Sequence, residues 1–481
     1  MRGALLFVAA SVLAAGAALE CNSDSFCDAD AQTCDAQADA SVPPVSGGGC
    51  DSSKPASQGG CAVAESDGYF VSPSGSDSAA GSKAAPFKTI GKGITAAAGD
   101  ATRPNVYVCQ GTYAENLVIQ AAPAGVALHG GFDCAEWTQS SAPTTVAPPS
   151  GYPLHVLGAA ALVESMTLTA PDATDPGGSS IAAFADGSPG MTFRRAAVTG
   201  GKAMAGATAA ASPALGPNTG GNSNPTSSAT GAASVSCPCG TDTTVGGQGG
   251  TYGVDGGAAG NGLPTISGMT GGLPGVQGAC AGGNGANGAS AAANGASTQT
   301  YGELTAQGWT SSAGGPGPAG GTAQGGGGGN WNDGNGLGGG GGACGGCGGK
   351  GGDAGHGGGA SIAIAALNTT LRVQASTIKS GAAGNGGDGA AGQPGQAGGN
   401  GGTGAGNQCS GGGGGTGGNG GAGGGGAGGI SVAVATNQGS PKPDVDSVST
   451  VLAGTPGHGG HDGSAAQTKA IDGIADTLHS F

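Results

Sequence analysis

The sequence predicts an all-β solenoid whose coils are interrupted by long glycine-rich segments. Three observations predict this class. Short apolar strands recur in pairs along the chain, 114 of the 481 residues are glycine, and only 9% are charged and 4% aromatic. A large compact core needs more Leu, Ile, Val and Phe than this, so the fold should be thin and repetitive.

The charge balance excludes some classes of partner. The net charge is −15 and the chain contains only 14 Lys and Arg residues. No basic patch for nucleic acid can be assembled from so few cations, and binding to anionic lipid is disfavoured for the same reason. We expect no nucleic-acid partner. Extracellular polysaccharide and cell-surface components remain open as partners, and the oligomeric state is not predicted.

The first twenty residues have the features of an export signal. Arg2 supplies the positive charge, an apolar run extends from Leu5 to Ala18, and residues 15–17 (AGA) offer small side chains for cleavage. The run is too short for a comfortable membrane span, and no other stretch qualifies as one. We therefore expect an exported protein with no transmembrane span in its mature form.

Thirteen cysteines also indicate an oxidising compartment. Cys21 lies directly after the apolar run, where a lipoprotein carries its acylated cysteine, whereas Glu20 departs from the small residue usual before it. A lipid anchor at Cys21 and release from the cell both remain open. The other twelve cysteines are disulfide candidates: Cys27, Cys34, Cys50, Cys61, Cys109, Cys134, Cys237, Cys239, Cys280, Cys344, Cys347 and Cys409.

The first strands follow a tether rich in Cys, Asp, Ser and Gly. Apolar strands are expected at 69–71, 106–108, 117–119 and 126–128, each bounded by Gly, Pro or Asn. Between the first two, residues 89–94 and the alanines after them predict a short helix.

This part of the chain carries a resemblance. Residues 71–77 (VSPSGSD), Pro86-Phe87-Lys88-Thr89-Ile90 and residues 106–113 (VYVCQGTY) are similar to the opening of secreted bacterial right-handed parallel β-helix proteins, which have a pectate-lyase-like fold. The resemblance covers about residues 69–134. It implies that the helix after Pro-Phe-x-Thr-Ile covers the open end of the solenoid. It implies no activity, because the family includes enzymes and non-enzymes.

An independent repeat supports the solenoid. Each of four pairs of apolar segments fits two strands of one coil, and coils bury apolar residues only by stacking on their neighbours. The pairs are 155–157 with 166–168, 181–184 with 191–194, 362–365 with 370–373, and 430–434 with 448–451.

The intervals between these coils locate two insertions. The first residues of successive pairs, 155, 181, 362 and 430, imply one coil of ordinary length and two coils that are much longer. The excess follows the same structural point each time, after residues 198–200 and after residues 378–380. We therefore expect two glycine-rich insertions that leave one corner of the solenoid and project on the same side.

Three structures were considered for the insertions. A collagen triple helix fails because runs such as residues 325–329 break the strict triplet and proline is near average. Disorder remains open. So does a polyglycine-II-like bundle, in which extended chains with three residues per turn pack closely and bond through their backbones. The segments look similar to such bundles in antifreeze and phage-adhesin proteins, and their composition resembles PGRS-type surface proteins.

The cysteines favour disulfides over metal ligands. Cys109 and Cys134 are separated by 25 residues, close to one coil, so they are expected to lie on adjacent coils and form a disulfide. Cys237, Cys239, Cys344 and Cys347 could supply four zinc thiolates, but their spacing is unlike that of a zinc ribbon. We predict no metal site and no cofactor.

No catalytic cluster is predicted either. Arg194, Arg195 and Arg372 occur at comparable coil positions, with Glu164 and Asp186 near in sequence. A calcium-dependent polysaccharide lyase needs several clustered carboxylates, and few are present here. His129 and His155 are isolated, with no matching nucleophile motif.

The end of the chain predicts a second capping helix. Ile471, Ile474, Leu478 and Phe481 fall on one helical face, with Ser464 as N-cap. This helix would cover the far end of the solenoid.

These features divide the chain and suggest a function. We hypothesise a non-enzymatic surface or extracellular structural or adhesion protein. A carbohydrate-active, polysaccharide lyase-like enzyme and an ice- or mineral-binding glycine bundle are the alternatives. The expected segments are a signal peptide (1–20), a tether (21–66), the first solenoid part (67–201), an insertion (202–359), a coil (360–381), an insertion (382–428), a last coil (429–454), and a C-terminal tail with the capping helix (455–481).

Overall fold

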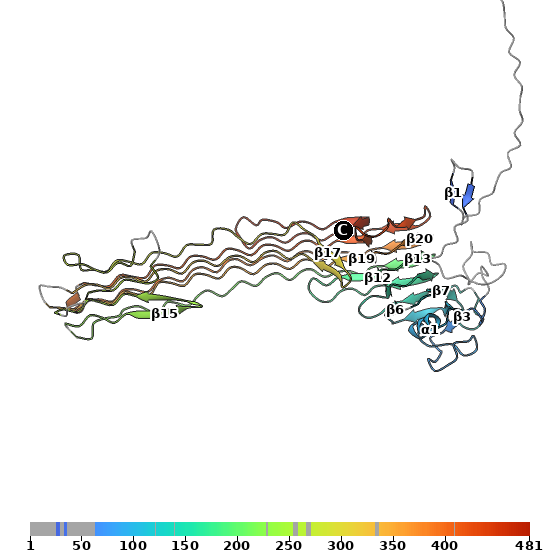
Figure 1. Ribbon diagram of the computed structural model, residues 1–481, viewed down its shortest axis with the longest axis horizontal. Helices are drawn as coiled ribbons and strands as arrows, with labels where there is room; N and C mark the ends of the chain where they lie inside the picture. Colours follow the sequence, from blue (N-terminus) through green and yellow to red (C-terminus); the bar gives the residue numbers. More distant parts are fainter. Residues whose placement is uncertain are drawn as a thin grey trace, which may run out of the picture.

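The computed structural model describes residues 63–481 apart from residues 121, 139, 228, 254–257, 266–270, 332–335 and 408. It also describes the backbone of two short antiparallel strands nearer the N-terminus, β1 (Phe26–Asp28) and β2 (Thr33–Asp35). The described chain has two visible parts: a stack of short strands, and a long arm of extended chains that projects from one side of the stack (Figure 1).

The stack consists of three parallel sheets. The first sheet contains, in order, β3 (Gly68–Val71), β4 (Asn105–Cys109), β7 (Val126–Phe132), β10 (Ala161–Glu164), β13 (Met191–Arg194), β20 (Leu371–Gln374) and β23 (Asp444–Val445). The second contains β5 (Gly111–Tyr113), β8 (Thr144–Val146), β11 (Met166–Thr169), β14 (Ala197–Thr199), β21 (Thr377–Lys379) and β24 (Thr450–Leu452). The third contains β6 (Leu117–Gln120), β9 (Leu154–Leu157), β12 (Ser180–Asp186), β19 (Ser361–Leu367), β22 (Ser431–Thr436) and β25 (Ala475–Ser480).

The chain visits the three sheets in a fixed order. It runs from β4 to β5 to β6 and then begins again with β7, so each coil from β4 onward contributes one strand to every sheet. Every pair of neighbouring strands within these sheets is parallel. This path confirms the predicted all-β class, with parallel strands in β-helix-like coils.

The register corrects the predicted coil boundaries. His155 pairs with Phe184 rather than with Ile181, and Ile362 pairs with Val432 rather than with Ile430. Ile181 pairs with Ile362. The prediction for the first coil omits β10, which lies between segments 155–157 and 166–168. The four sequence pairs therefore do not represent the same two sheets in every coil.

The corner between the first and second sheets is turned by a left-handed residue. Ser165, Arg195 and Ala375 occupy equivalent positions in successive coils and have φ angles of 52°, 51° and 46°. Each donates its backbone N–H to the next coil, as Ser165 does to the carbonyl O of Arg194 at 3.1 Å. Such φ values are uncommon for residues with a side chain, so the stacked bonds hold the turn in place.

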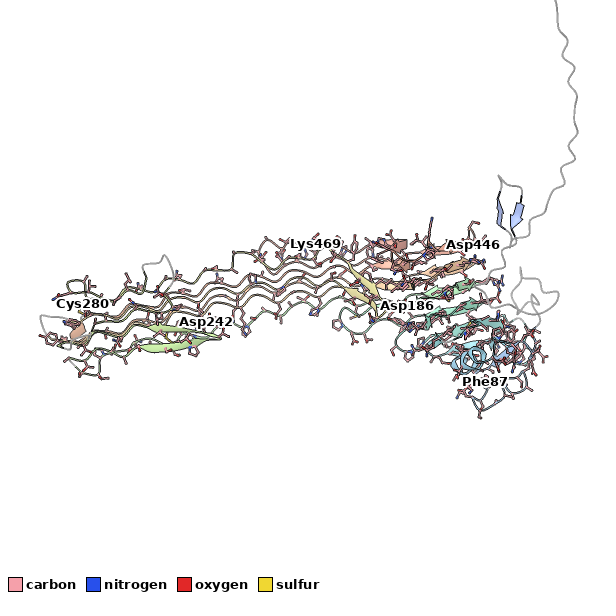
Figure 2. The ribbon with its side chains drawn as sticks, in the orientation of Figure 1. Phe87, Asp186, Asp242, Cys280, Asp446 and Lys469 are labelled. Atoms are coloured by element: carbon pink, nitrogen blue, oxygen red, sulfur yellow. A yellow bond between two sulfur atoms is a disulfide. The ribbon has the colours of Figure 1, made fainter. Side chains whose placement is uncertain are left out.

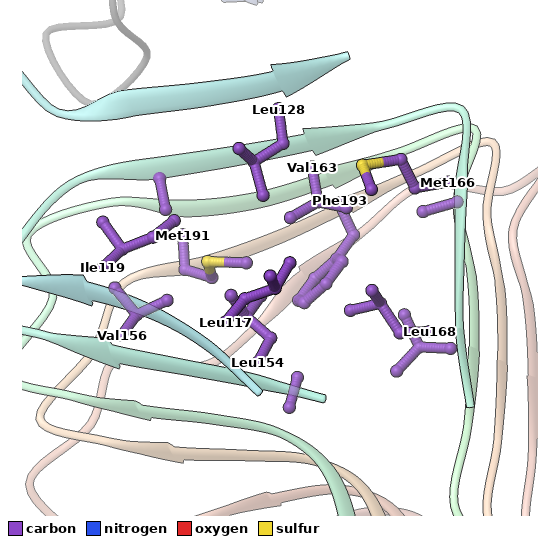
Figure 3. Close-up of a cluster of buried hydrophobic side chains, with 14 of the residues drawn as sticks. Leu117, Ile119, Leu128, Leu154, Val156, Val163, Met166, Leu168, Met191 and Phe193 are labelled. Carbon is purple, nitrogen blue, oxygen red and sulfur yellow. The ribbon is translucent and has the colours of Figure 1, made fainter. Parts of the chain in front are cut away.

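Apolar side chains from all three sheets fill the interior of the stack. Alternate residues of each strand point inward, as in β6, where Leu117 and Ile119 are buried and their neighbours are exposed. Figure 3 shows the resulting cluster, to which residues of several coils contribute. Its labelled members are Leu117, Ile119, Leu128, Leu154, Val156, Val163, Met166, Leu168, Met191 and Phe193.

A helix closes the first end of this core. Helix α1 (Ile90–Ala98) buries Ile90 and Ile94 against the first coils. Its N-cap is Thr89, whose hydroxyl accepts from the N–H of Lys92 at 3.2 Å. The carboxylate of Glu115 accepts the N–H groups of Ile90 and Gly91, at 3.0 Å each. The short helix predicted around residues 89–94 is therefore present.

The predicted helix at the other end is wrong. Residues 475–480 form β25, which pairs with β22 as the last strand of the third sheet. The preceding residues join the arm, because the N–H groups of Gly457 and Gly460 donate to the carbonyls of Gly429 and Gly426 at 2.9 Å. Glycines weaken a helix, and the open edge of β22 offers a complete ladder of partners instead.

Both glycine-rich segments leave the stack between the second and third sheets. One lies between β14 and β19, and the other lies between β21 and β22. They run side by side along the arm, bonded to one another through their backbones (Figure 1). The antiparallel hairpin of β17 (Gly302–Thr305) and β18 (Gly308–Ser311) lies at the root of the arm.

That hairpin attaches the arm to the stack. Leu304 and Trp309 pack over the outer face of the third sheet, in a cluster with Phe184, Ile362 and Val432. Without the hairpin, this face would be an exposed apolar surface.

Candidate functional site

The arm is the most distinctive surface of the protein, and its backbone is ordered by hydrogen bonds at every third residue. The N–H groups of Gly346, Gly349, Gly352 and Gly355 donate to the carbonyls of Gly415, Gly418, Gly421 and Gly424, each at 2.9 Å. A repeat of three residues matches the left-handed extended helix of polyglycine II and does not match the two-residue repeat of a β-strand.

Each inner chain of the arm has more than two neighbours. Gly349 donates to Gly418 and accepts from Gly320 at 2.8 Å, while the next carbonyl, of Lys350, accepts from Gln393 at 2.9 Å. A strand in a flat sheet bonds to two neighbours at most, whereas three residues per turn direct bonds to several sides. The described parts of the segments are thus packed as a bundle of extended chains that bond to several neighbours.

Close packing explains the Gly-Gly-X pattern of the inner chains. A Cβ at Gly348 or Gly349 would lie 2.0 Å from the carbonyl O of Gly320 or 1.9 Å from that of Gln393. Real Cβ atoms do not approach so closely, so both positions require glycine. The third residue of each turn faces outward, as do the exposed side chains of Lys350, Asp353 and His356.

Side chains of the outer chain 282–298 satisfy the remaining amides of chain 411–429. The side-chain oxygens of Asn284, Asn287 and Asn294 accept the N–H groups of residues 413, 416 and 422 at 2.8–3.0 Å, and Ser290 and Ser297 accept those of residues 419 and 425 at 3.1 Å. These side-chain bonds add to the backbone bonds between the same two chains, such as that from the N–H of Gly285 to the carbonyl of Gly413 at 2.8 Å.

Three disulfides cross-link the arm. They join Cys237 to Cys344, Cys239 to Cys347, and Cys280 to Cys409. Cys344 and Cys347 are three residues apart, so in a chain with three residues per turn they face the same side, where the hairpin of β15 (Val235–Cys239) and β16 (Asp242–Gly246) meets them. Figure 2 places Cys280 at the far end of the arm.

The disulfides are expected to hold the distal arm in its packed form. Mutating both Cys280 and Cys409 to alanine opens a loop of 129 residues and should reduce stability by about 4–5 kcal/mol in the chain-entropy estimate. Hydrogen exchange should then accelerate at the arm tip, whereas the amides of the stack should be unchanged. Equal acceleration in both parts would contradict independent stabilisation of the arm.

The remaining cysteines lie in the stack and nearer the N-terminus. The structure contains the Cys109–Cys134 disulfide, with the two Cα atoms 5.0 Å apart on adjacent coils. The backbone register places Cys27 opposite Cys34 in β1 and β2. The side chains of those two residues, and Cys21, Cys50 and Cys61, lie outside the described residues.

The distal arm exposes large apolar side chains. Tyr252, Leu263, Leu273 and Val276 are exposed by 42%, 43%, 53% and 60%. Val276 pairs with Ala279, next to Cys280 at the far end, and Leu263 pairs with Val245 of β16. We call these four residues the distal apolar patch. Sequence reasoning missed the patch, because single apolar residues in a glycine-rich segment give no periodic signal.

A buried ionic cluster lies on the first sheet. His129, Glu164 and Arg194 occupy the same register position on three neighbouring strands. The Glu164 carboxylate, 2% exposed, lies 2.7 Å from Nδ1 of His129 and accepts from Nε of Arg194 at 2.8 Å. Arg195 also donates to it through Nη2. The sequence had suggested that His129 is isolated. The structure corrects this, because the stacking of coils brings His129 and Glu164 together.

The cluster holds Glu164 in its charged form. Although burial opposes ionisation, the hydrogen bond from His129 and the charges of His129, Arg194 and Arg195 lower the pKa of Glu164 to about 2. Nε2 of His129 is 3.0 Å from Oδ1 of Asn105. The contacts of His129, Arg194 and Arg195 thus converge on Glu164 and join three neighbouring coils.

The remaining candidates for lyase chemistry lie apart from this cluster. Arg372 pairs with Asp444 at 3.8 Å, and its register partner is Thr192. Asp186 ends β12 in the third sheet, whereas Arg194 and Arg372 lie in β13 and β20 of the first sheet. His155 is on the outer side of the third sheet between Tyr152 and Phe184, where burial lowers its pKa. The structure thus brings Arg194 and Arg195 to Glu164 but leaves Arg372 and Asp186 elsewhere.

The described residues hold neither a metal-binding cluster nor a membrane-spanning helix. They contain no group of three or more His, Cys, Asp or Glu side chains arranged to hold a metal ion. Within the same residues, no helix has the length and apolar character that crossing a bilayer requires.

Comparison with known proteins locates one family. Residues 73–133 match the family described as a protein of unknown function (DUF1565), which is associated with parallel β-helix proteins. The match covers α1 and the first coils, the part of the chain that carries the sequence resemblance. Neither the curated proteins nor the solved structures contain a match.

Proposed function

We propose that this chain is an exported, non-enzymatic structural or adhesion protein of the cell surface or extracellular matrix, in which a right-handed parallel β-helix carries a glycine-rich arm. The observation that supports it most directly is the arm itself. Backbone bonds at every third residue and three disulfides make the arm a stiff projection that ends in exposed apolar side chains.

A binding role gives a reason for a glycine-rich arm that is ordered despite the entropy cost of ordering glycine. Glycine loses more conformational entropy on folding than any other residue, so a long ordered glycine segment needs compensation from packing and cross-links. A stiff arm holds its tip at a fixed distance from the stack, and a surface protein that reaches a partner beyond its own layer benefits from that distance.

Export fits the same proposal. Disulfides persist in oxidising compartments, and four pairs are present. In this scheme residues 1–20 direct export and residues 21–66 tether the solenoid, with the chain either released or anchored by a lipid on Cys21. The two insertions, 202–359 and 382–428, form one functional arm.

The lyase-like alternative receives less support from the site. A lyase base must be free to take a proton from the sugar, but Arg194 and Arg195 both donate to Glu164. The proposed partners are therefore bound and not cleaved: extracellular polysaccharides or other cell-surface components.

A binding assay tests this proposal. Oxidised full-length protein is incubated with a panel of immobilised polysaccharides and with intact cells, with and without calcium. We expect retention without release of oligosaccharides, and we expect Leu273→Asp together with Val276→Asp to reduce retention at least fivefold. The matched control is Val118→Asp on β6, where the side chain is similarly exposed at 42%. Release of unsaturated oligosaccharides, or equal retention by all three proteins, would overturn the proposal.

A further inference from the structure

The last coil leaves the apolar interior of the stack open. Val434 in β22 is 0% exposed, whereas its register partner Leu478 in β25 is 42% exposed. The same change occurs in the second sheet, where Ile378 is fully buried and its partner Val451 is only partly buried. Val448, between β23 and β24, is 71% exposed. The interior therefore ends in an apolar surface that no described residue covers.

The sheet edges at this end are unpaired as well. β23, β24 and β25 are the terminal strands of the three sheets, and each is bonded to a neighbour on one side only within the described chain. Open edges of this kind are templates for further strand pairing. Helix α1 covers the first end of the stack but has no counterpart here, because the residues predicted to form a capping helix form β25.

We propose that this open end is a twofold interface, through which two copies of the chain join last coil to last coil. The partner must present three sheet edges with the spacing and twist of this stack, and a second copy does so. A twofold axis perpendicular to the axis of the stack reverses the strand direction in the second copy. The facing edge strands of the two copies are then antiparallel, and the apolar interior is continuous from one copy to the other. A single added peptide could cover only one of the three edges.

The charges of the open end permit such contact. Asp444 pairs with Arg372 at 3.8 Å, and the Asp476 carboxylate lies 2.8 Å from Nδ1 of His479, so each of these two carboxylates has a partner within its own copy. The chain before the stack is a poorer occupant. Val63 packs at the first end, beside Phe70 and Trp137, and residues 21–62 contain few apolar side chains.

The interface closes on itself. The open ends of the two copies are both buried in one isologous contact. The opposite end of each stack is covered by α1, so the product is a dimer and not a filament. This inference is independent of the proposed function, because it rests on the stack and not on the arm.

Sedimentation equilibrium of the oxidised full chain over a range of concentrations tests the interface. We expect a reversible species with twice the chain mass. Leu478→Lys should raise its dissociation constant at least tenfold, whereas Leu273→Lys, at the similarly exposed distal apolar patch, should leave it unchanged. Circular dichroism and the melting temperature establish that each variant is folded.

Hydrogen exchange provides a second readout that needs no variant. Amides of β25 should exchange more slowly at high protein concentration, whereas those of the exposed arm chain 282–298 should not depend on concentration. A monomer at every concentration, a dimer weakened by Leu273→Lys, or a dimer that Leu478→Lys leaves intact would each overturn the proposal.

Discussion

Replacing Glu164 with glutamine is expected to destabilise the stack by about 3 kcal/mol at neutral pH, because it leaves His129, Arg194 and Arg195 without their buried anion. The glutamine side chain has nearly the same shape, so lost packing contributes little. Chemical denaturation followed by circular dichroism measures the change. The matched control is Asp444→Asn, where the carboxylate is 69% exposed and pairs with Arg372 at 3.8 Å. This control should cost less than about 1 kcal/mol.

The stabilisation by the charged Glu164 carboxylate should also depend on pH. The pKa of Glu164 is lowered to about 2 in the folded protein, below its ordinary value of 4.5. The unfolded state therefore takes up the proton first as the pH falls. The contribution is complete above about pH 5 and is lost as the pH falls toward 2. Glu164→Gln should remove this part of the acid sensitivity. A variant as stable as the wild type, with an unchanged acid profile, would contradict the role of the cluster.

Gly414→Ala is expected to disrupt the arm, and Gly413→Ala is its matched control on the adjacent residue. A Cβ at Gly414 would lie 1.8 Å from the carbonyl O of Cys344, whereas at Gly413 the nearest atom would be 3.5 Å away. The clash should destabilise the arm by about 1–3 kcal/mol or more. Alanine at position 413 fits the space and restricts the unfolded chain, so it should be neutral or stabilise by up to about 1 kcal/mol.

Thermal unfolding of the two variants distinguishes an ordered bundle from a flexible segment. In a bundle the midpoint should fall for Gly414→Ala and stay or rise for Gly413→Ala. Equal midpoints for the two variants would mean that neighbouring chains do not contact Gly414.

The sequence predicted the fold of the stack better than its register. Alternating apolar residues marked strands such as β4 and β6, and the motif around Thr89 marked α1. β10 was missed because coil lengths vary, and the spacing of two apolar segments does not reveal a strand between them. The helix expected at residues 464–481 had a helical apolar pattern, but pairing with the edge of β22 outweighed that local preference.

The site was less accessible to sequence reasoning. Glu164 and His129 are 35 positions apart in the chain, and only the register of β7 and β10 makes them neighbours. In the arm, the glycine-rich sequence left both disorder and a polyglycine-II-like bundle open. Which chains pair depends on contacts between segments far apart in sequence, as between Gly349 and Gly418.

Amide hydrogen exchange along the arm tests the central claim most directly. The account predicts slow exchange at Gly346, Gly349, Gly352 and Gly355, whose N–H groups donate to chain 411–429 in the interior of the bundle. Protection at these residues, comparable to that of β19 and β22, would establish the arm as a folded and stiff element. Exchange at the rate of an unstructured peptide would contradict the bundle and the function proposed for it.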